Sequence, residues 1–125
     1  MFEPYVDEDF YKTKYLGKVT KDLAQKIKQA QQHTDALTFN RIVGIGFENL
    51  TPFRQSVIKE VICQQVDFED ENRELLDSVL TSYSINGVSM NFGNNWNVMI
   101  QNGIAMKRST FELLKQTGLT NRVIK

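Results

Sequence analysis

The sequence predicts a small, mostly α-helical protein of the α+β class. The expected architecture is a bundle of about three to four helices, with one or two β-hairpins before a short C-terminal helix. Three observations predict it: two long segments with apolar residues at helical spacing, two Asn-Gly pairs between apolar residues, and a capping-box pattern near the end. The 125 residues have the length of one domain, 1–125, in which residues 118–125 form a tail.

Two helices are expected in the first third of the chain. Residues 7–17 should form a short helix with Asp7 as its N-cap and Gly17 just past its end. A longer helix is expected over residues 20–42, with Thr20 as its cap. Its buried stripe consists of Leu23, Ile27, Ala30, Thr34 and Leu37. The residues expected mostly off this stripe are Lys21, Lys26, Lys28, Gln31 and Gln32.

A central helix is expected after residues 43–50, which have no helical period and should form a loop. Thr51-Pro52 is a typical helix start, because threonine accepts from free amides and proline suits the first helical position. The broad apolar face that follows consists of Phe53, Val57, Ile58, Val61, Ile62 and Val66. Several elements of the same chain could cover this face, or another subunit could share it, and we favour sharing between identical copies. The acidic residues 67–77 should form a loop with a helical turn.

Two hairpins and a final helix are expected in the last third. Asn86-Gly87 favours a type I′ turn in a ribbon that places Tyr83, Ile85, Val88, Met90 and Phe92 on one face. Asn102-Gly103 could turn a second hairpin that pairs Gln101 with Ile104 and Met99 with Met106, although a helix starting at Ile104 is the competing interpretation. Ser109 and Glu112 should then cap a short helix. Gly118 suits a left-handed position at its end, with Leu119 against Leu114.

Composition and charge argue against several functional classes. The chain has 15 basic and 15 acidic residues, whereas a dedicated nucleic-acid binder usually has a basic excess. No apolar run approaches the roughly 20 residues that span a bilayer, and the acidic start does not resemble a signal peptide. The single cysteine, Cys63, cannot form an internal disulfide, which is typical of a reducing cytoplasm.

No arrangement of residues typical of an enzyme stands out. His33, the only histidine, is expected to be an exposed helix residue, and Cys63 a small buried one. The carboxylates of residues 69–77 lack the spacing of a calcium loop, so they should form a solvated segment, with an interaction surface or a metal site as lesser alternatives. Trp96 is expected to fill the core or to contact another subunit. We therefore expect a binding protein that is not an enzyme and has no cofactor or metal.

Three stretches in order carry a family resemblance. Residues 30–42 (AQQHTDALTFNRI) contain an alanine, an aspartate and then Thr-Phe-x-Arg-Ile, and residues 82–90 read SYSINGVSM. Residues 113–124 (LLKQTGLTNRVI) contain Leu-x-x-Thr-Gly-Leu followed by an arginine and a β-branched residue. Together they resemble the head–tail connector proteins (adaptor or head-completion proteins) of tailed bacteriophages. The resemblance is to the versions found in phages and prophages of Gram-positive bacteria. The resemblance covers about residues 7–124, and Thr34 departs from it, standing where an aliphatic residue is commoner.

The resemblance implies a structural virion protein, assembled in the host bacterial cytoplasm, that acts at the head–tail interface. It would form a homo-oligomeric ring, usually a dodecamer, beneath the portal protein, and the ring would extend the DNA channel and dock the head-closure (stopper) or tail-completion protein. DNA would pass without sequence-specific binding, and no membrane is involved. The implied portal-binding residues are Leu119, Thr120, Asn121, Arg122, Val123 and Ile124. The residues implied in subunit contacts are Tyr83, Ser84, Trp96 and Arg41.

A small helical DNA-binding or regulatory module is the alternative. Lysines gather on or near the start of the long helix: Lys14, Lys18, Lys21, Lys26 and Lys28. A concentrated basic face would give salt-sensitive affinity for DNA.

Overall fold

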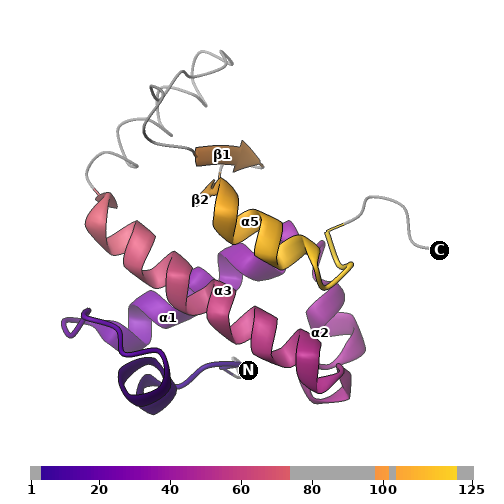
Figure 1. Cartoon of the computed structure of the whole chain (residues 1–125), viewed down its shortest axis with the longest axis horizontal. Coiled ribbons are helices and arrows are strands. Elements are labelled where there is room, and N and C mark those ends of the chain that lie inside the picture. The colour runs from indigo at the N-terminus through magenta and orange to yellow at the C-terminus, as the bar shows by residue number, and fades with distance from the viewer. Residues whose placement is uncertain (1–3, 74–97, 102–103, 121–125) are drawn as a thin grey trace.

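The structure is a computed structural model that describes residues 4–73, 98–101 and 104–120 (Figure 1). It is mostly helical. The main helices are α1 (Leu23–Leu37), α2 (Arg41–Ile45), α3 (Pro52–Glu71) and α5 (Arg108–Lys115). A π-helical turn, η1 (Phe10–Lys14), and a 3₁₀ turn, η2 (Phe47–Asn49), lie between them, and β1 (Val98–Gln101) and β2 (Ile104–Lys107) precede α5.

Helix α3 is the central element, as the sequence predicts. It packs against α1 on one side and against α5 and β2 on the other. Its start is the expected one: Thr51 Oγ1 accepts the N–H of Arg54 at 3.2 Å, and Pro52 occupies the first turn. Its end is not, because residues 67–71 continue the helix where a loop was expected.

The broad apolar face of α3 is covered within one chain, which corrects the expectation that identical copies share it. The described buried residues form two clusters that meet along this helix. The first, which includes Ile58, Ile62 and Val66, faces α1 and the N-terminal segment. The second, which includes Val57 and Val61, faces the end of α1, β2 and α5. Phe53 is the exception, because 56% of it is exposed.

Helix α1 has the predicted buried stripe but different ends. All five stripe residues are buried. Asp22, in a left-handed conformation, precedes the helix, and no side chain caps it, so the expected cap at Thr20 is wrong. The helix stops at Leu37 because Phe39 and Asn40 are left-handed, and residues 41–45 then form the separate helix α2 where residues 43–50 were expected to be a loop.

Two polar residues of α1 are buried: Gln31, which was expected off the stripe, and Thr34, which was expected in it. Gln31 is buried, and its Oε1 accepts the backbone N–H of Tyr5 at 2.7 Å. The hydroxyl of buried Thr34 donates to the carbonyl of Ala30 at 2.9 Å, so a threonine is accommodated in the stripe without an unsatisfied hydroxyl.

The N-terminal segment makes a short helical turn as predicted, but Gly17 has another role. Asp7 Oδ1 accepts the N–H of Phe10 at 2.7 Å, as an N-cap does. The left-handed residue at the end of the turn is Leu16, with φ of 62°. Gly17 is instead needed for close contact, because a Cβ there would lie 2.0 Å from Cζ of Tyr11.

Strands β1 and β2 pair antiparallel in the expected register, with Met99 opposite Met106 and Gln101 opposite Ile104. The turn at Asn102-Gly103 and the ribbon over residues 82–93 lie outside the described residues. Helix α5 begins directly after β2, with Lys107 as its N-cap and no side-chain cap, so the expected capping box is wrong. Gly118 has the predicted left-handed φ of 76°. Leu119 belongs to the first core cluster and Leu114 to the second, which does not support the expected contact between them.

Candidate interaction surface

Two residues that the sequence assigns to different partners meet at the C-terminal end of the described chain. Arg41 was expected at a subunit interface and Leu119 at the portal. Arg41 Nη1 donates to the carbonyl oxygen of Leu119 at 3.0 Å. The Arg41 guanidinium also lies over the ring of Phe39, 4.9 Å from its centroid. Arg41 of the Thr-Phe-x-Arg-Ile stretch therefore binds the backbone of the last leucine of the Leu-x-x-Thr-Gly-Leu stretch.

The turn that presents Arg41 has an unusual backbone. Phe39 and Asn40 have φ values of 57° and 59°, and a left-handed conformation is costly for a bulky side chain. The hydroxyl of Thr38 closes the end of α1 by donating to the carbonyls of Thr34 and Asp35, both at 3.1 Å. Ile42, in the first turn of α2, is fully buried and anchors this helix to the core.

The segment after α5 is held by its own hydrogen bonds. The hydroxyl of Thr117 donates to the carbonyl of Leu114 at 2.7 Å and accepts the N–H of Leu119 at 3.2 Å. Both Thr117 and Leu119 are buried, and left-handed Gly118 makes the turn between them. Each residue of Thr-Gly-Leu thus has a structural role.

The structure describes three of the predicted site residues, Arg41, Leu119 and Thr120. Leu119 is only 6% exposed and packs in the core of the single chain, and its assignment to the portal stays a prediction. Thr120 follows it and is half-buried. The remaining predicted site residues lie outside the described part of the chain: Tyr83, Ser84, Trp96, Asn121, Arg122, Val123 and Ile124.

An apolar surface that sequence reasoning missed lies beside the Arg41–Leu119 contact. Phe39, Val43 and Ile45 are 40%, 61% and 44% exposed, and we call these three residues the α2 patch. Gly44 lies between Val43 and Ile45, and a Cβ there would meet no atom of the described part of the chain within 4 Å. Assigning residues 43–50 to a loop concealed this patch, because the exposed side of α2 exists only once the residues are helical.

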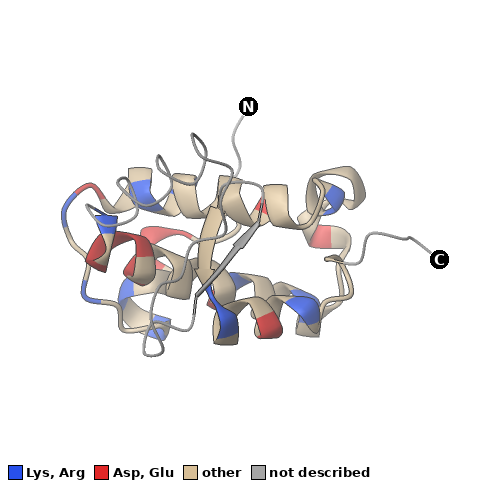
Figure 2. Cartoon of the chain, turned by 90° about the horizontal axis from the view of Figure 1, so that it is seen from above, with Lys and Arg blue, Asp and Glu red and all other residues tan. Residues whose placement is uncertain are grey.

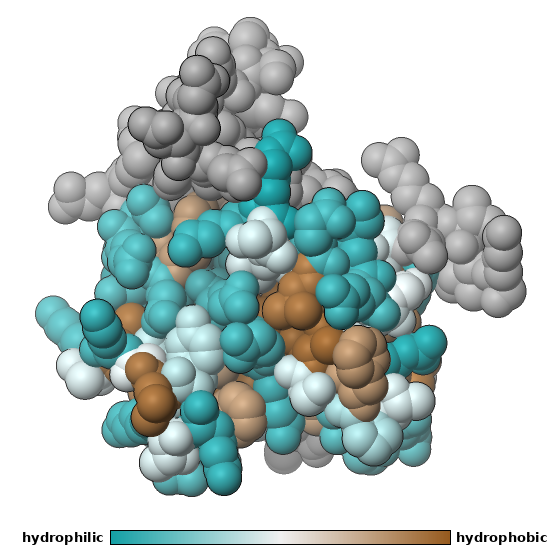
Figure 3. All heavy atoms as spheres, in the orientation of Figure 1, coloured by the Kyte–Doolittle hydropathy of each residue, from teal (hydrophilic) through white to brown (hydrophobic). Residues whose placement is uncertain are grey.

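A further stretch of apolar surface lies on the face seen in Figure 3. Apolar side chains gather there between α5 and the N-terminal half of α3 and are flanked by hydrophilic ones. Phe53 is exposed at this end of α3, and Phe111 and Leu113 of α5 are partly buried against the second core cluster. Four of the five exposed large apolar residues among those described thus fall between positions 39 and 53.

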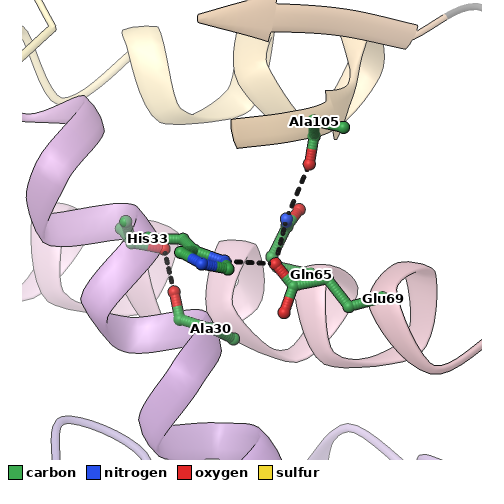
Figure 4. A network of polar contacts seen from close by, with 6 residues as sticks. Ala30, His33, Gln65, Glu69 and Ala105 are labelled. Carbon is green, nitrogen blue, oxygen red and sulfur yellow. Dashed lines mark hydrogen bonds and ion pairs between the residues drawn. The ribbon is translucent and has the colours of Figure 1, made fainter. Parts of the chain in front are cut away.

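A polar network joins α1, α3 and β2 (Figure 4). Glu69 Oε2 lies 2.5 Å from His33 Nδ1 and accepts from Gln65 Nε2 at 2.7 Å. Gln65 Nε2 also donates to the carbonyl of Ala105 at 2.9 Å. His33 was expected to be exposed, yet it is half-buried and pairs with a carboxylate from the segment that was expected to be solvated.

A second polar network ties the N-terminal segment to α3. The hydroxyls of Tyr11 and Tyr15 donate to the two carboxylate oxygens of Asp67, and Tyr11 Oη also accepts the N–H of Val19 at 3.1 Å. Burial, with the hydrogen bond to Asp67 second, raises the pKa of both tyrosines above their usual value. Tyr5 donates in the same way to Asp35 and stacks on Phe47, with centroids 4.6 Å apart.

The described residues hold little reactive chemistry. Cys63 is fully buried, and burial, followed by the charges of Glu60 and Asp67, raises the pKa of its thiol to about 12. No three or more His, Cys, Asp or Glu side chains of the described residues are grouped so as to hold a metal ion. No helix in the described ranges combines the length and the apolar character required to cross a bilayer.

Basic and acidic positions alternate along the ribbon in the view of Figure 2. Lys26, one of the lysines of the alternative DNA-binding interpretation, pairs with Asp70 of α3 at 2.6 Å. Lys14, Lys18 and Lys21 are exposed. The carboxylates at the end of α3 thus serve as partners for residues of α1 and the N-terminal segment.

Comparisons with known proteins give no relative: no family model, no curated protein and no solved structure matches the chain.

Proposed function

We propose that the protein is a head–tail connector of a tailed bacteriophage or prophage, forming an adaptor ring beneath the portal. The observation that carries the proposal is the ordered resemblance of residues 30–42, 82–90 and 113–124 to that family. The ring extends the DNA channel and docks the stopper or tail-completion protein. Its role is structural, with no turnover of substrate.

Contacts between two of the three stretches support the proposal. Arg41 bonds the Leu119 carbonyl, and Ile42 and Leu119 belong to the same core cluster. Thr38 closes the end of α1 with its hydroxyl. Thr117 and left-handed Gly118 form the turn that follows α5. Residues of two of the three stretches that carry the resemblance therefore meet at one place in the molecule.

The surface proposed for ring contacts is not the broad apolar face of α3, because other elements of the same chain cover that face. A ring needs a heterologous contact, in which each subunit presents two different patches to its neighbours. The exposed apolar side chains of Phe53 and the α2 patch are suited to one side of such a contact, and the near-neutral net charge allows copies to approach. Buried Leu119 leaves residues 120–125 as the portal-binding segment, with Leu119 as its anchor.

The experiment is a binding assay with the cognate portal protein. Portal and adaptor are mixed and separated by size-exclusion chromatography with light scattering. The proposal predicts a complex heavier than the portal by several adaptor subunits, at moderate salt and without DNA. A chain that ignores the portal and instead shifts DNA in a salt-dependent manner would support the DNA-binding alternative and overturn the proposal.

A further inference from the structure

We propose that the C-terminal residues 121–125 of the same chain dock on the α2 patch in the free protein. The occupant is the apolar pair Val123 and Ile124, which follows the buried anchor at Leu119. The proposal concerns the isolated chain and does not rest on the connector function.

The first argument is where the tail leaves the body of the protein. Arg41 opens α2 and holds the Leu119 carbonyl at 3.0 Å, while its guanidinium covers Phe39 of the patch. The tail therefore starts beside the patch. Val123 follows Leu119 by four residues, which span at most about 14 Å when extended. This reach is comparable with the dimensions of a helix as short as α2.

The second argument is the shape and chemistry of the patch. Val43, Gly44 and Ile45 are consecutive and exposed, so α2 presents apolar side chains on either side of a glycine. Because none of the described residues occupies the space beside Gly44, an extended segment can approach the helix backbone there. β-Branched side chains such as Val123 and Ile124 suit an extended conformation.

The third argument is the strain in the turn that builds the patch. Two consecutive non-glycine residues, Phe39 and Asn40, are left-handed, at an expected cost of about 1–3 kcal/mol each. Strain of this kind persists where the surrounding structure holds it, and it is enriched at binding sites. In this turn the Phe39 ring is 40% exposed and lies beneath the Arg41 guanidinium.

Other parts of the chain are less well placed to cover the patch. Residues 74–97 begin after the opposite end of α3, a helix of 20 residues and thus about 30 Å long. They lead into β1, whose partner β2 contacts Gln65 in the C-terminal half of α3. Residues 1–3 precede Tyr5, which stacks on Phe47 of η2, so they provide the competing occupant within the chain.

The test is disulfide formation between cysteines placed in the patch and in the tail of the full chain. The I45C/V123C pair is compared in a glutathione redox buffer with the control pair E71C/V123C, in which Glu71 is exposed at the far end of α3. Native Cys63 is fully buried, and peptide mapping identifies the bonded pair. We expect an intramolecular disulfide whose effective concentration exceeds that of the control by roughly tenfold or more.

Three outcomes overturn the proposal. Equal effective concentrations for the two pairs would mean that the tail does not dock. A disulfide that forms only between chains, and increases with protein concentration, would mean that a second copy occupies the patch. More favourable disulfide formation in an F2C/I45C pair would assign the patch to the N-terminus.

As a second readout, the V123S/I124S variant should shift the methyl NMR signals of Val43 and Ile45, and unchanged signals would also reject the proposal.

Discussion

Arg41 and Leu119 are joined by a hydrogen bond of 3.0 Å although 78 residues separate them in the sequence. The bond ties the start of α2 to the segment that leads out of the described structure. Because Leu119 is buried and its carbonyl is held, the residues that follow have a fixed point of departure. The contact therefore links the folded part of the protein to residues 120–125, the segment proposed to bind the portal.

Replacing Arg41 should loosen this attachment. Arg41→Ala removes a charged hydrogen-bond donor and the contact with Phe39, so we expect the free energy of unfolding to fall by about 1–3 kcal/mol. Urea unfolding measures the change, and Arg54→Ala, at an exposed position of α3, is the matched control with little expected effect. Equal stability of the two variants would show that the Arg41 contact contributes nothing.

Substitution by alanine should affect the stability of the protein differently at Gly17 and at Gly44. Gly17→Ala places a Cβ 2.0 Å from the buried Tyr11 ring and should destabilise the protein by about 1–3 kcal/mol. In a chain that ends at Leu119, and so lacks the tail proposed to dock there, the Cβ of Gly44→Ala meets none of the described residues within 4 Å, and the substitution should be neutral or stabilise by up to about 1 kcal/mol. Thermal unfolding of both variants checks the pair, and a destabilised Gly44→Ala protein would contradict the packing described here.

Stability should fall in alkaline solution. Burial and hydrogen bonds to carboxylates raise the pKa of Tyr5, Tyr11 and Tyr15 in the folded state, so the folded protein retains protons that the unfolded chain releases. The stabilisation is complete below the unfolded tyrosine pKa of about 10 and is lost as the pH rises above it. Cys63, whose folded pKa is about 12 against an ordinary value of 9.0, adds to the same fall.

The measurement is urea unfolding at about pH 8 and about pH 10.5, on either side of the unfolded tyrosine pKa. Tyr15→Phe should start about 0.5–1.5 kcal/mol less stable, because it loses a hydrogen bond, and should then lose less between the two pH values. An identical pH dependence for wild type and Tyr15→Phe would contradict the raised pKa of Tyr15 in the folded state.

Gln65 should be more sensitive to substitution than its polar character suggests. It is fully buried and bridges Glu69 and the Ala105 carbonyl, so Gln65→Met leaves that carbonyl without this donor. We expect a loss of about 1–3 kcal/mol and faster amide exchange in β2. Gln32→Met, at an exposed position of α1, is the control and should change neither quantity.

Deleting Thr120–Lys125 should separate folding from attachment. The truncated chain keeps Leu119, whose terminal carboxylate can still accept from Arg41, so its circular dichroism and unfolding midpoint should stay close to those of the full chain. Its affinity for the portal should fall at least about tenfold if the tail is the portal-binding segment. Unchanged affinity in a folded truncated protein would assign portal binding elsewhere.

The sequence predicted the elements whose signals are local. The Thr51-Pro52 start, the α1 stripe and the left-handed Gly118 depend on neighbouring residues, and the structure confirms them. The caps predicted at Thr20 and Ser109 were wrong because the two helices begin after Asp22 and Lys107. The role predicted for Gly17 was wrong because Tyr11 requires a glycine there for close contact and not for its backbone freedom.

The interaction surface was harder to predict than the helices. The Arg41–Leu119 bond and the α2 patch depend on a break at Phe39 and Asn40 that no glycine or proline marks in the sequence. The width of the α3 face was read correctly, but its cover was not, since the chain itself provides α1 on one side and α5 with β2 on the other. Residue spacing alone does not distinguish cover by the same chain from cover by another copy.

The most direct test of the connector proposal is negative-stain electron microscopy of the cognate portal with and without this protein. The account predicts an additional ring of density on one end of the portal, centred on the channel axis, that is lost with the truncated chain. Portal particles that look the same in the presence of excess folded full-length protein would contradict it.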